Sequence, residues 1–157
     1  MSHSREMTAE EASREGVKTY YEQMANGEKK YKMLGDDGSY YCRTAASSEG
    51  AWQNSHVHHQ VTEHYFVQSG WIAYAACAEK DQAASVSILK AGVHVIVPPG
   101  VQHNVYMAPH SVIHTIKFGA NTAGDWHASP ELDQFTRNLT ESELLGRLQN
   151  DECISEE

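Results

Sequence analysis

Five potential metal ligands lie within nine residues of this chain: His56, His58, His59, Glu63 and His64. His56 and His58 are two residues apart, so on a β-strand both rings leave the backbone from the same face. Glu63 follows after a short polar gap in which the chain has room to bend. Two imidazoles and a carboxylate are donors that a divalent first-row metal takes on one side of its coordination sphere. The stretch therefore favours a fold in which these three side chains meet, with His59 and His64 outside the ligand set.

A third imidazole is available from residues 92–107, which read GVHVIVPPGVQHNVYM. Residues 93–97 are apolar and rich in β-branched side chains, which is typical of a buried strand. The Pro98–Gly100 segment then predicts a turn. His103 comes three residues after that glycine, where the next strand would begin. A hairpin at this place returns the ring of His103 toward the first stretch.

The order and spacing of these residues resemble the two sequence motifs of the cupin superfamily. The first motif is a glycine, five residues, His-x-His, three or four residues, a glutamate, six residues and a glycine, and it is matched by Gly50, His56, His58, Glu63 and Gly70. The second motif is a glycine, five residues, Pro-x-Gly, two residues, a histidine, three residues and an asparagine, and it is matched by Gly92, Pro98, Gly100 and His103. Met107 stands where the asparagine is usual. The resemblance covers about residues 40–118.

This resemblance implies an all-β, cupin-type jelly-roll barrel that binds a divalent metal through His56, His58, Glu63 and His103. Fe(II) is the first expectation for the metal, with Mn, Ni, Zn and Co as alternatives. The asparagine of the second motif is not a metal ligand in the family, so Met107 bears on substrate binding in the pocket. A cupin that has kept these residues without the metal is the alternative that the sequence leaves open.

Two further residues are candidates for acid–base catalysis. Tyr65 is two residues beyond Glu63 and shares its strand face, so its phenol would lie beside the metal; aromatic packing on the barrel wall is the alternative. His114 falls on the same face as the apolar residues of an expected strand at 111–118, which predicts an inward imidazole. That imidazole would serve either as a base or as a hydrogen-bonded core histidine.

Basic residues before the first motif offer sites for an anionic group. Arg43 shares a strand face with Tyr41 and, if that face is inward, would hold a substrate carboxylate or phosphate; a surface position is the alternative. Lys117, by contrast, is expected on the solvent side of its strand. Three lysines, Lys29, Lys30 and Lys32, are expected in a solvated turn, with an anion-binding lip as the alternative.

The expected ligand set leaves about two positions free on an octahedral metal, which favours catalysis over a structural role. We expect an enzyme that acts on a small oxygen-rich metabolite as an isomerase, epimerase or lyase, with the metal as Lewis acid. An Fe(II)-dependent dioxygenase is the second hypothesis, and a non-catalytic cupin that binds a small molecule is the third. Consumption of dioxygen by the iron-loaded protein separates the first two.

The chain carries a formal net charge of −9 over 157 residues, which argues against nucleic acid and anionic membranes as partners. No run approaches the ~20 apolar residues of a transmembrane helix, and the N-terminal sequence lacks the apolar core of a secretion signal. Three cysteines without metal or redox spacing indicate free thiols and a cytoplasmic protein. A small-molecule substrate is therefore the expected partner.

The chain is expected to form a single cupin domain over residues 1–157, with its barrel core at about 40–118. An N-terminal helix is predicted at about 9–25, because Thr8 and Glu11 form a capping box and apolar residues follow at helical spacing. These apolar residues are Val17, Tyr20, Tyr21 and Met24. Short helices at about 130–149 close the chain. The apolar stripe of the N-terminal helix is expected to pair two copies as a homodimer.

Overall fold

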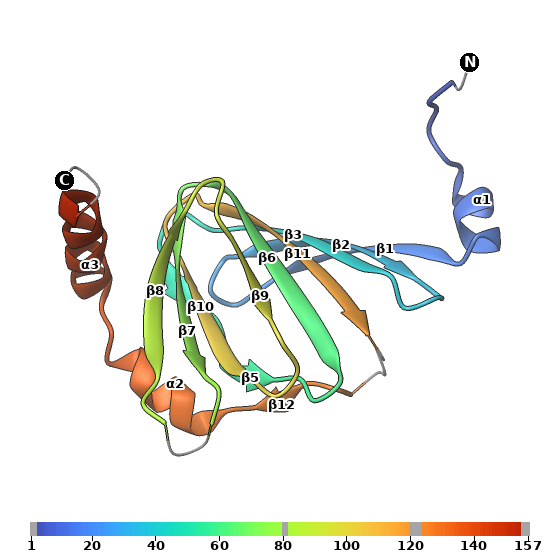
Figure 1. The fold of residues 1–157 in the computed structure, drawn as a ribbon. Coiled ribbons are helices and arrows are strands. Elements are labelled where there is room, and N and C mark those ends of the chain that lie inside the picture. Colours follow the sequence, from blue (N-terminus) through green and yellow to red (C-terminus); the bar gives the residue numbers. More distant parts are fainter. Residues whose placement is uncertain (1–2, 80–81, 120–123, 155–157) are drawn as a thin grey trace.

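The computed structural model describes residues 3–79, 82–119 and 124–154, which build two antiparallel β-sheets that face each other (Figure 1). In spatial order, the first sheet consists of β1 (Val17–Gln23), β2 (Lys29–Gly35), β3 (Tyr40–Ala45), β11 (Val112–Gly119), β6 (Val61–Ser69) and β9 (His94–Val97). The second consists of β12 (His127–Ala128), β5 (His56–Val57), β10 (Gln102–Met107), β7 (Trp71–Cys77) and β8 (Ser85–Lys90), with β4 (Ala51–Trp52) also paired to β10. The predicted all-β fold is confirmed.

The apolar core lies between the two sheets, and strand β6 shows how it is built. Val61, Glu63, Tyr65 and Val67 are buried on one face of β6, while the residues between them are more open to solvent. The core cluster around Tyr65 and Val67 is completed by Ile72, Val97, Val105, Met107 and Ile113. A carboxylate therefore occupies a core position of β6, where it needs partners because burying an unpaired charge is costly.

Helices flank the sandwich at both ends of the described chain: α1 (Ala9–Arg14), α2 (Pro130–Arg137) and α3 (Glu141–Ile154). The predicted capping box of α1 is present, since Thr8 Oγ1 accepts from Glu11 N at 3.2 Å and Thr8 N donates to Glu11 Oε2 at 2.8 Å. A second capping box joins Thr140 and Glu143 at the start of α3. Among the described residues, no helix combines the length and the apolar character needed to cross a membrane.

The N-terminal helix is shorter than the sequence pattern predicts, and the expected end near residue 25 is wrong. Helix α1 ends at Arg14, because Gly16 adopts a φ of +67°, a conformation that stops a helix. Val17, Tyr20 and Tyr21 lie instead in β1, which pairs with β2 along its whole length. The tyrosine and β-branched residues of this segment favour a strand, and that preference overrides the helical spacing of its apolar side chains. The barrel core accordingly begins at Val17 rather than near residue 40.

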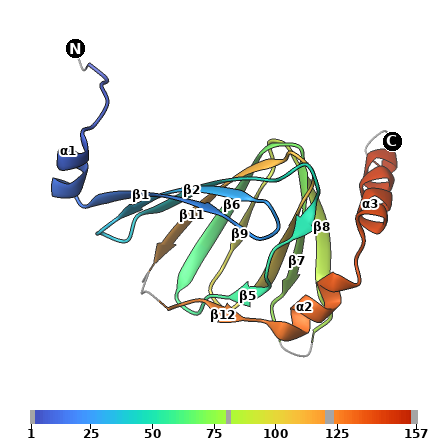
Figure 2. The same ribbon diagram turned by 180° about the vertical axis from the view of Figure 1, so that it is seen from behind.

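The two outer faces of the sandwich differ in what covers them. Helices α2 and α3 lie on the outer side of the second sheet (Figure 2). Leu144 of α3 is fully buried against Ala73 and Tyr106. On the first sheet, outward side chains form a row that follows the ladder pairs across all six strands: Thr19, Met33, Tyr41, Ile116, His64 and Ile96. The exposed fractions of Met33, Ile116 and Ile96 are 46%, 41% and 52%, so this face presents apolar side chains to solvent.

Candidate metal centre

The four residues of the predicted ligand set meet between the sheets. His56 on β5 lies directly opposite His103 on β10, and His58 comes just after β5. Glu63 reaches the same point from β6 of the first sheet. One donor atom of each side chain lies within 4.8 Å of the others, and all four residues are buried. The predicted turn joins the two motifs, since Gly100 N donates to the carbonyl of His58 at 2.7 Å.

Each imidazole of this set is oriented by a hydrogen bond from Nδ1 to a backbone carbonyl. His56 and His103 each donate to the carbonyl two residues earlier in the chain, at 3.0 and 2.9 Å. His58 donates to the carbonyl of Asp125. A carbonyl oxygen only accepts, so Nδ1 carries a proton, and in the neutral tautomer that binds a metal the lone pair of Nε2 points to the centre.

The donor set fits a divalent metal. His103 Nε2 is buried and has no hydrogen-bond partner in the described part of the chain, and it lies 3.6 Å from Glu63 Oε2. A metal ion would satisfy this lone pair, because zinc and its neighbours take imidazole nitrogen and carboxylate oxygen together. Burial alone would raise the pKa of Glu63, but the three surrounding imidazoles and the charge of Lys117 hold that pKa well below its usual value. The carboxylate therefore stays ionised.

Lys117 faces the centre, so the expectation that it lies on the solvent side of its strand is wrong. It stands opposite Glu63 in the ladder between β11 and β6, and its Nζ lies 3.2 Å from Glu63 Oε1. The same Nζ is 4.8 Å from the ring centroid of Tyr40, its neighbour on β3. The buried carboxylate thus receives a counter-charge from the adjacent strand.

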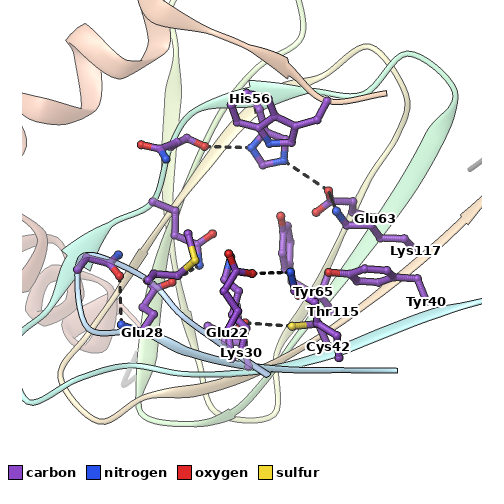
Figure 3. A pocket seen from close by; sticks show the side chains of 18 of the residues that line it. Glu22, Glu28, Lys30, Tyr40, Cys42, His56, Glu63, Tyr65, Thr115 and Lys117 are labelled. Atoms are coloured by element: carbon purple, nitrogen blue, oxygen red, sulfur yellow. Dashed lines mark hydrogen bonds and ion pairs between the residues drawn. The ribbon is translucent and has the colours of Figure 1, made fainter. Parts of the chain in front are cut away.

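A cavity of about 440 Å³ opens beside the centre (Figure 3). It extends to the turn between β1 and β2, and in Figure 3 Glu28 of this turn lies across the cavity from Glu63. Its wall carries both signs of charge, in the side chains of Glu22, Glu28, Glu63, Lys30, Lys32 and Lys117. Lys30 and Lys32 therefore belong to a strand in the cavity wall and not to the solvated turn that was expected.

Residues 124–128 form a strap beside the imidazoles. The carboxylate of Asp125 accepts hydrogen bonds from the backbone N–H groups of residues 59–61, at 2.9, 2.9 and 3.1 Å. These N–H groups lower the pKa of Asp125. Trp126 stacks on His56 with ring centroids 5.4 Å apart, and it also lines the cavity. The strap therefore holds His58 through the carbonyl of Asp125 and covers His56 with an indole ring.

Tyr65 lies where the sequence places it, and His114 does not. Tyr65 is 4% exposed and lines the cavity beside Glu63. Burial first, and then the charge of Glu63, raise the pKa of Tyr65 well above its usual value, so the phenol keeps its proton. His114 lies on the outer face of the first sheet, where Nδ1 is 2.6 Å from Tyr41 Oη and Nε2 contacts Gln68. The predicted inward base is wrong, because Ile113, Thr115 and Lys117 take the inward positions of β11.

The two predicted substrate-binding residues also lie elsewhere. Arg43 points outward and packs over the Tyr31 ring at 4.5 Å, while Cys42 and Thr44 take the inward positions of β3. Met107 is fully buried in the apolar core and is not among the residues that line the cavity. Neither side chain is therefore placed to bind a substrate in this cavity.

Comparisons with solved structures show which fold the chain adopts. No protein-family model matches the sequence, and no curated protein matches it. Among solved structures, the cupin domain of Drosophila melanogaster CENP-C aligns with a TM-score of 0.58 at 11% identity, over 72% of this chain and 82% of that one. The capsular polysaccharide assembling protein CapF from Staphylococcus aureus aligns with a TM-score of 0.59 at 16% identity, over 71% of this chain and 31% of that one. The chain has the cupin fold.

Cupin domains with different functions align with this chain. A mutant of Bacillus subtilis oxalate decarboxylase aligns with a TM-score of 0.56 at 10% identity, over 80% of this chain and 36% of that one. The chain thus spans about a third of the CapF and oxalate decarboxylase chains. One of the solved structures is an enzyme, whereas another is CENP-C bound to CAL1. The cupin fold alone therefore does not separate catalysis from protein binding.

Several residues of the site carry only a weak signal in the sequence. Lys117 lies on the same face of its strand as Ile113 and Thr115. This alternation identifies Lys117 as inward only if the barrel interior is already known to be polar. Asp125 and Trp126 lie in a short segment without periodicity. Glu28 follows Asn26-Gly27, a dipeptide typical of the tight turn between two paired strands.

Proposed function

We propose that this cupin is a metal-dependent enzyme that acts on a small oxygen-rich metabolite as an isomerase, epimerase or lyase. The observation that carries the proposal is the joint placement of three oriented imidazoles and an ionised carboxylate beside a cavity of about 440 Å³, which His56 and Glu63 line. A cavity of this size suits a small ligand rather than a polymer. A ligand set with four protein donors leaves about two positions on an octahedral metal for substrate oxygen atoms.

A bound divalent metal would supply Lewis acidity toward a carbonyl or hydroxyl oxygen of the substrate. His56, His58, Glu63 and His103 would hold it, with Fe(II) as the first candidate and Mn, Ni, Zn or Co as alternatives. Tyr65 is the candidate proton donor, because its phenol is neutral, buried and on the cavity wall. Trp126 and the β1–β2 turn form the sides of the cavity.

The first experiment asks whether the metal is present. The protein is purified without chelator or affinity metal and examined by elemental analysis, and the expected result is about one transition-metal ion per chain. A protein that holds no metal, and takes none up after incubation with Fe(II), Mn²⁺, Ni²⁺, Co²⁺ or Zn²⁺, would refute the proposal.

The second experiment asks which chemistry occurs. Small hydroxy and keto acids and sugars are incubated in D₂O with the metal-loaded protein, and NMR is used to detect deuterium incorporation or double-bond formation. Exchange that disappears in the chelator-treated protein supports proton-transfer chemistry. Consumption of dioxygen by the iron-loaded protein without such exchange would assign a dioxygenase instead. Saturable binding without any turnover would assign a non-catalytic binding protein.

A further inference from the structure

A buried carboxylate lies in the cavity away from the metal ligands. Glu28 sits in the turn between β1 and β2 and is 2% exposed. Its Oε2 accepts a hydrogen bond from Gln53 Nε2 at 3.0 Å. Its Oε1 is buried and has no hydrogen-bond partner among the residues that the structure describes. Buried polar atoms of this kind are rare in folded proteins and need an explanation.

The turn that carries Glu28 is built to hold this side chain in place. Glu28 N donates to Asn26 Oδ1 at 3.1 Å, and Met24 N donates to the carbonyl of Glu28 at 2.8 Å. Gly27 has a φ of +86°, and a Cβ there would lie 2.8 Å from Ser47 Cβ, so the turn packs closely against the chain before the first motif. The position of Glu28 is therefore fixed by its backbone and not by chance packing of a surface side chain.

The charges of the cavity indicate the sign of its ligand. Three carboxylates and three ammonium groups line the wall, so they balance: Glu22, Glu28, Glu63, Lys30, Lys32 and Lys117. Lys32 Nζ lies 2.7 Å from Glu22 Oε2. Burial raises the pKa of Glu28, and the positive charge of Lys30 opposes this rise. A divalent metal held by neutral imidazoles would add two positive charges beside Glu63. The loaded cavity therefore favours an anionic group at the metal end.

At the Glu28 end, a neutral donor fits better than a cation. Lys30 already supplies a positive charge near this carboxylate. Gln53 occupies Oε2 with a neutral N–H donor, which leaves one acceptor atom for one further donor. A hydroxyl group has the size and the polarity to donate this remaining hydrogen bond to Glu28 Oε1.

We infer that the cavity binds a small hydroxylated carboxylate, with its carboxylate group at the metal end and a hydroxyl group donating to Glu28 Oε1. The inference rests on the proposed metal-dependent function and specifies its substrate class. Glu28 and Gln53 then form the subsite that distinguishes a hydroxylated chain from an apolar one. Such a subsite discriminates strongly, because a ligand without the hydroxyl leaves the buried acceptor unpaired.

Three probes test the two ends separately: D-gluconate, hexanoate and D-glucitol. The protein is loaded with a stoichiometric amount of Mn²⁺, desalted, and titrated with each probe by calorimetry. Gluconate carries both groups and is expected to bind about 10-fold or more tightly than hexanoate, which lacks hydroxyls, and than glucitol, which lacks the carboxylate. Glu28→Leu, which removes the acceptor at similar volume, should weaken gluconate by about 10-fold and leave the affinity for hexanoate unchanged.

Two controls separate this role from a structural one. Metal content and melting temperature of Glu28→Leu should match or exceed those of the wild type, because the variant removes an unsatisfied buried charge. Glu28→Gln is the second variant if the leucine variant does not fold. Equal losses for gluconate and hexanoate, hexanoate binding as tightly as gluconate, or no binding of any probe to the metal-loaded protein would overturn the inference. Failure of the wild type to take up metal would instead refute the proposed function and remove the charge argument with it.

Discussion

At the scale of single residues, the proposed function distinguishes groups that would hold the metal from groups that would act on a substrate. His103 belongs to the first kind, because its Nε2 is buried at the centre and has no hydrogen-bond partner in the described chain. Tyr65 belongs to the second kind, since its raised pKa keeps a proton on a phenol that faces the cavity. His114 belongs to neither, because its ring is hydrogen-bonded on the outer face of the sheet.

This separation predicts different losses for three variants. His103→Ala should lose the metal, whereas Tyr65→Phe should keep the metal and lose about 10²–10⁴ in turnover. His114→Ala is the matched control and should leave both properties unchanged. Elemental analysis and the deuterium-exchange rate provide the two measurements. Metal loss in Tyr65→Phe, or a large rate loss in His114→Ala, would contradict the assignment.

Glu28 also predicts a dependence of stability on pH. Burial raises the pKa of Glu28, while Lys30, Gln53 and Asn26 act in the opposite direction. A group whose pKa is raised by folding stabilises the protein below its unfolded pKa, here about 4.5, and this contribution is lost as the pH rises through the raised value. Glu28→Gln mimics the protonated side chain, so it should raise the free energy of unfolding by about 1 kcal/mol at neutral pH. The gain should vanish toward pH 4.5.

The measurement is thermal unfolding of metal-free wild type and Glu28→Gln between pH 7 and pH 5. Metal-free protein is used so that ligand binding does not contribute to the melting temperature. A variant that is less stable than the wild type at neutral pH would show that the ionised carboxylate stabilises the fold.

At the scale of elements, the sequence predicts the strands that carry the metal ligands better than it predicts which way other strands face. The motifs place His56, His58 and Glu63 correctly because turn residues at fixed spacing determine register. In the second half of β11, Ile116 and Phe118 point outward and Lys117 points inward, the reverse of the common pattern, because the interior holds a charged site and the outer face is apolar. Polarity alternation alone therefore identifies the strand but not its buried side.

The strap at residues 124–128 should determine how firmly His58 is held. Asp125→Ala removes the acceptor of three backbone N–H groups and frees the carbonyl that orients His58. Loss of an orienting partner typically costs about 10–100-fold in metal affinity. His59→Ala, an exposed neighbour whose backbone N–H is retained, should bind metal normally. Competition titrations against a chromogenic chelator measure both affinities, and equal affinities for the two variants would show that the strap has no such role.

The β1–β2 turn should depend on its glycine. Gly27→Ala places a side chain at a φ of +86°, with a Cβ 2.8 Å from Ser47, and should lower the free energy of unfolding by about 1–2 kcal/mol. Gly146→Ala is a matched control in α3, where a Cβ meets nothing within 4 Å, and should raise the free energy by about 0.5–1 kcal/mol. Denaturant unfolding of the two variants compares the signs directly. Stabilisation by Gly27→Ala would mean that the turn relaxes into another conformation.

At the scale of the whole molecule, α2 and α3 cover the outer face of the second sheet, and no helix of the described residues covers the outer face of the first. The first sheet presents exposed apolar side chains along the row through Met33, Ile116 and Ile96. The neighbouring row, through Tyr21, Tyr31, Arg43, His114, Phe66 and His94, also contains no carboxylate. In a chain with a net charge of −9, this face is where two copies can meet without strong repulsion. The homodimer thus stays a prediction, with the first sheet in place of the expected helical stripe.

Light scattering coupled to size-exclusion chromatography should show a dimer for the wild type. Ile116→Glu adds a carboxylate at the centre of the row and should shift the protein to a monomer. Leu145→Glu, at an exposed position of α3, should leave the dimer intact. A wild-type monomer at micromolar concentration would refute the prediction, as would a dimer that only Leu145→Glu dissolves.

Lys117 provides the buried carboxylate of Glu63 with a counter-charge from within the chain. Its ammonium group lies on β11 opposite Glu63. A metal ion that binds Glu63 would therefore have to displace this ammonium group from the carboxylate. Ions that prefer oxygen donors, such as Mg²⁺ and Ca²⁺, gain little from the three imidazoles and compete poorly for a carboxylate with a resident partner. Ions that bind imidazole well gain enough to displace it. Lys117 therefore offsets the charge of Glu63 in the metal-free fold and would disfavour abundant hard cations at the site.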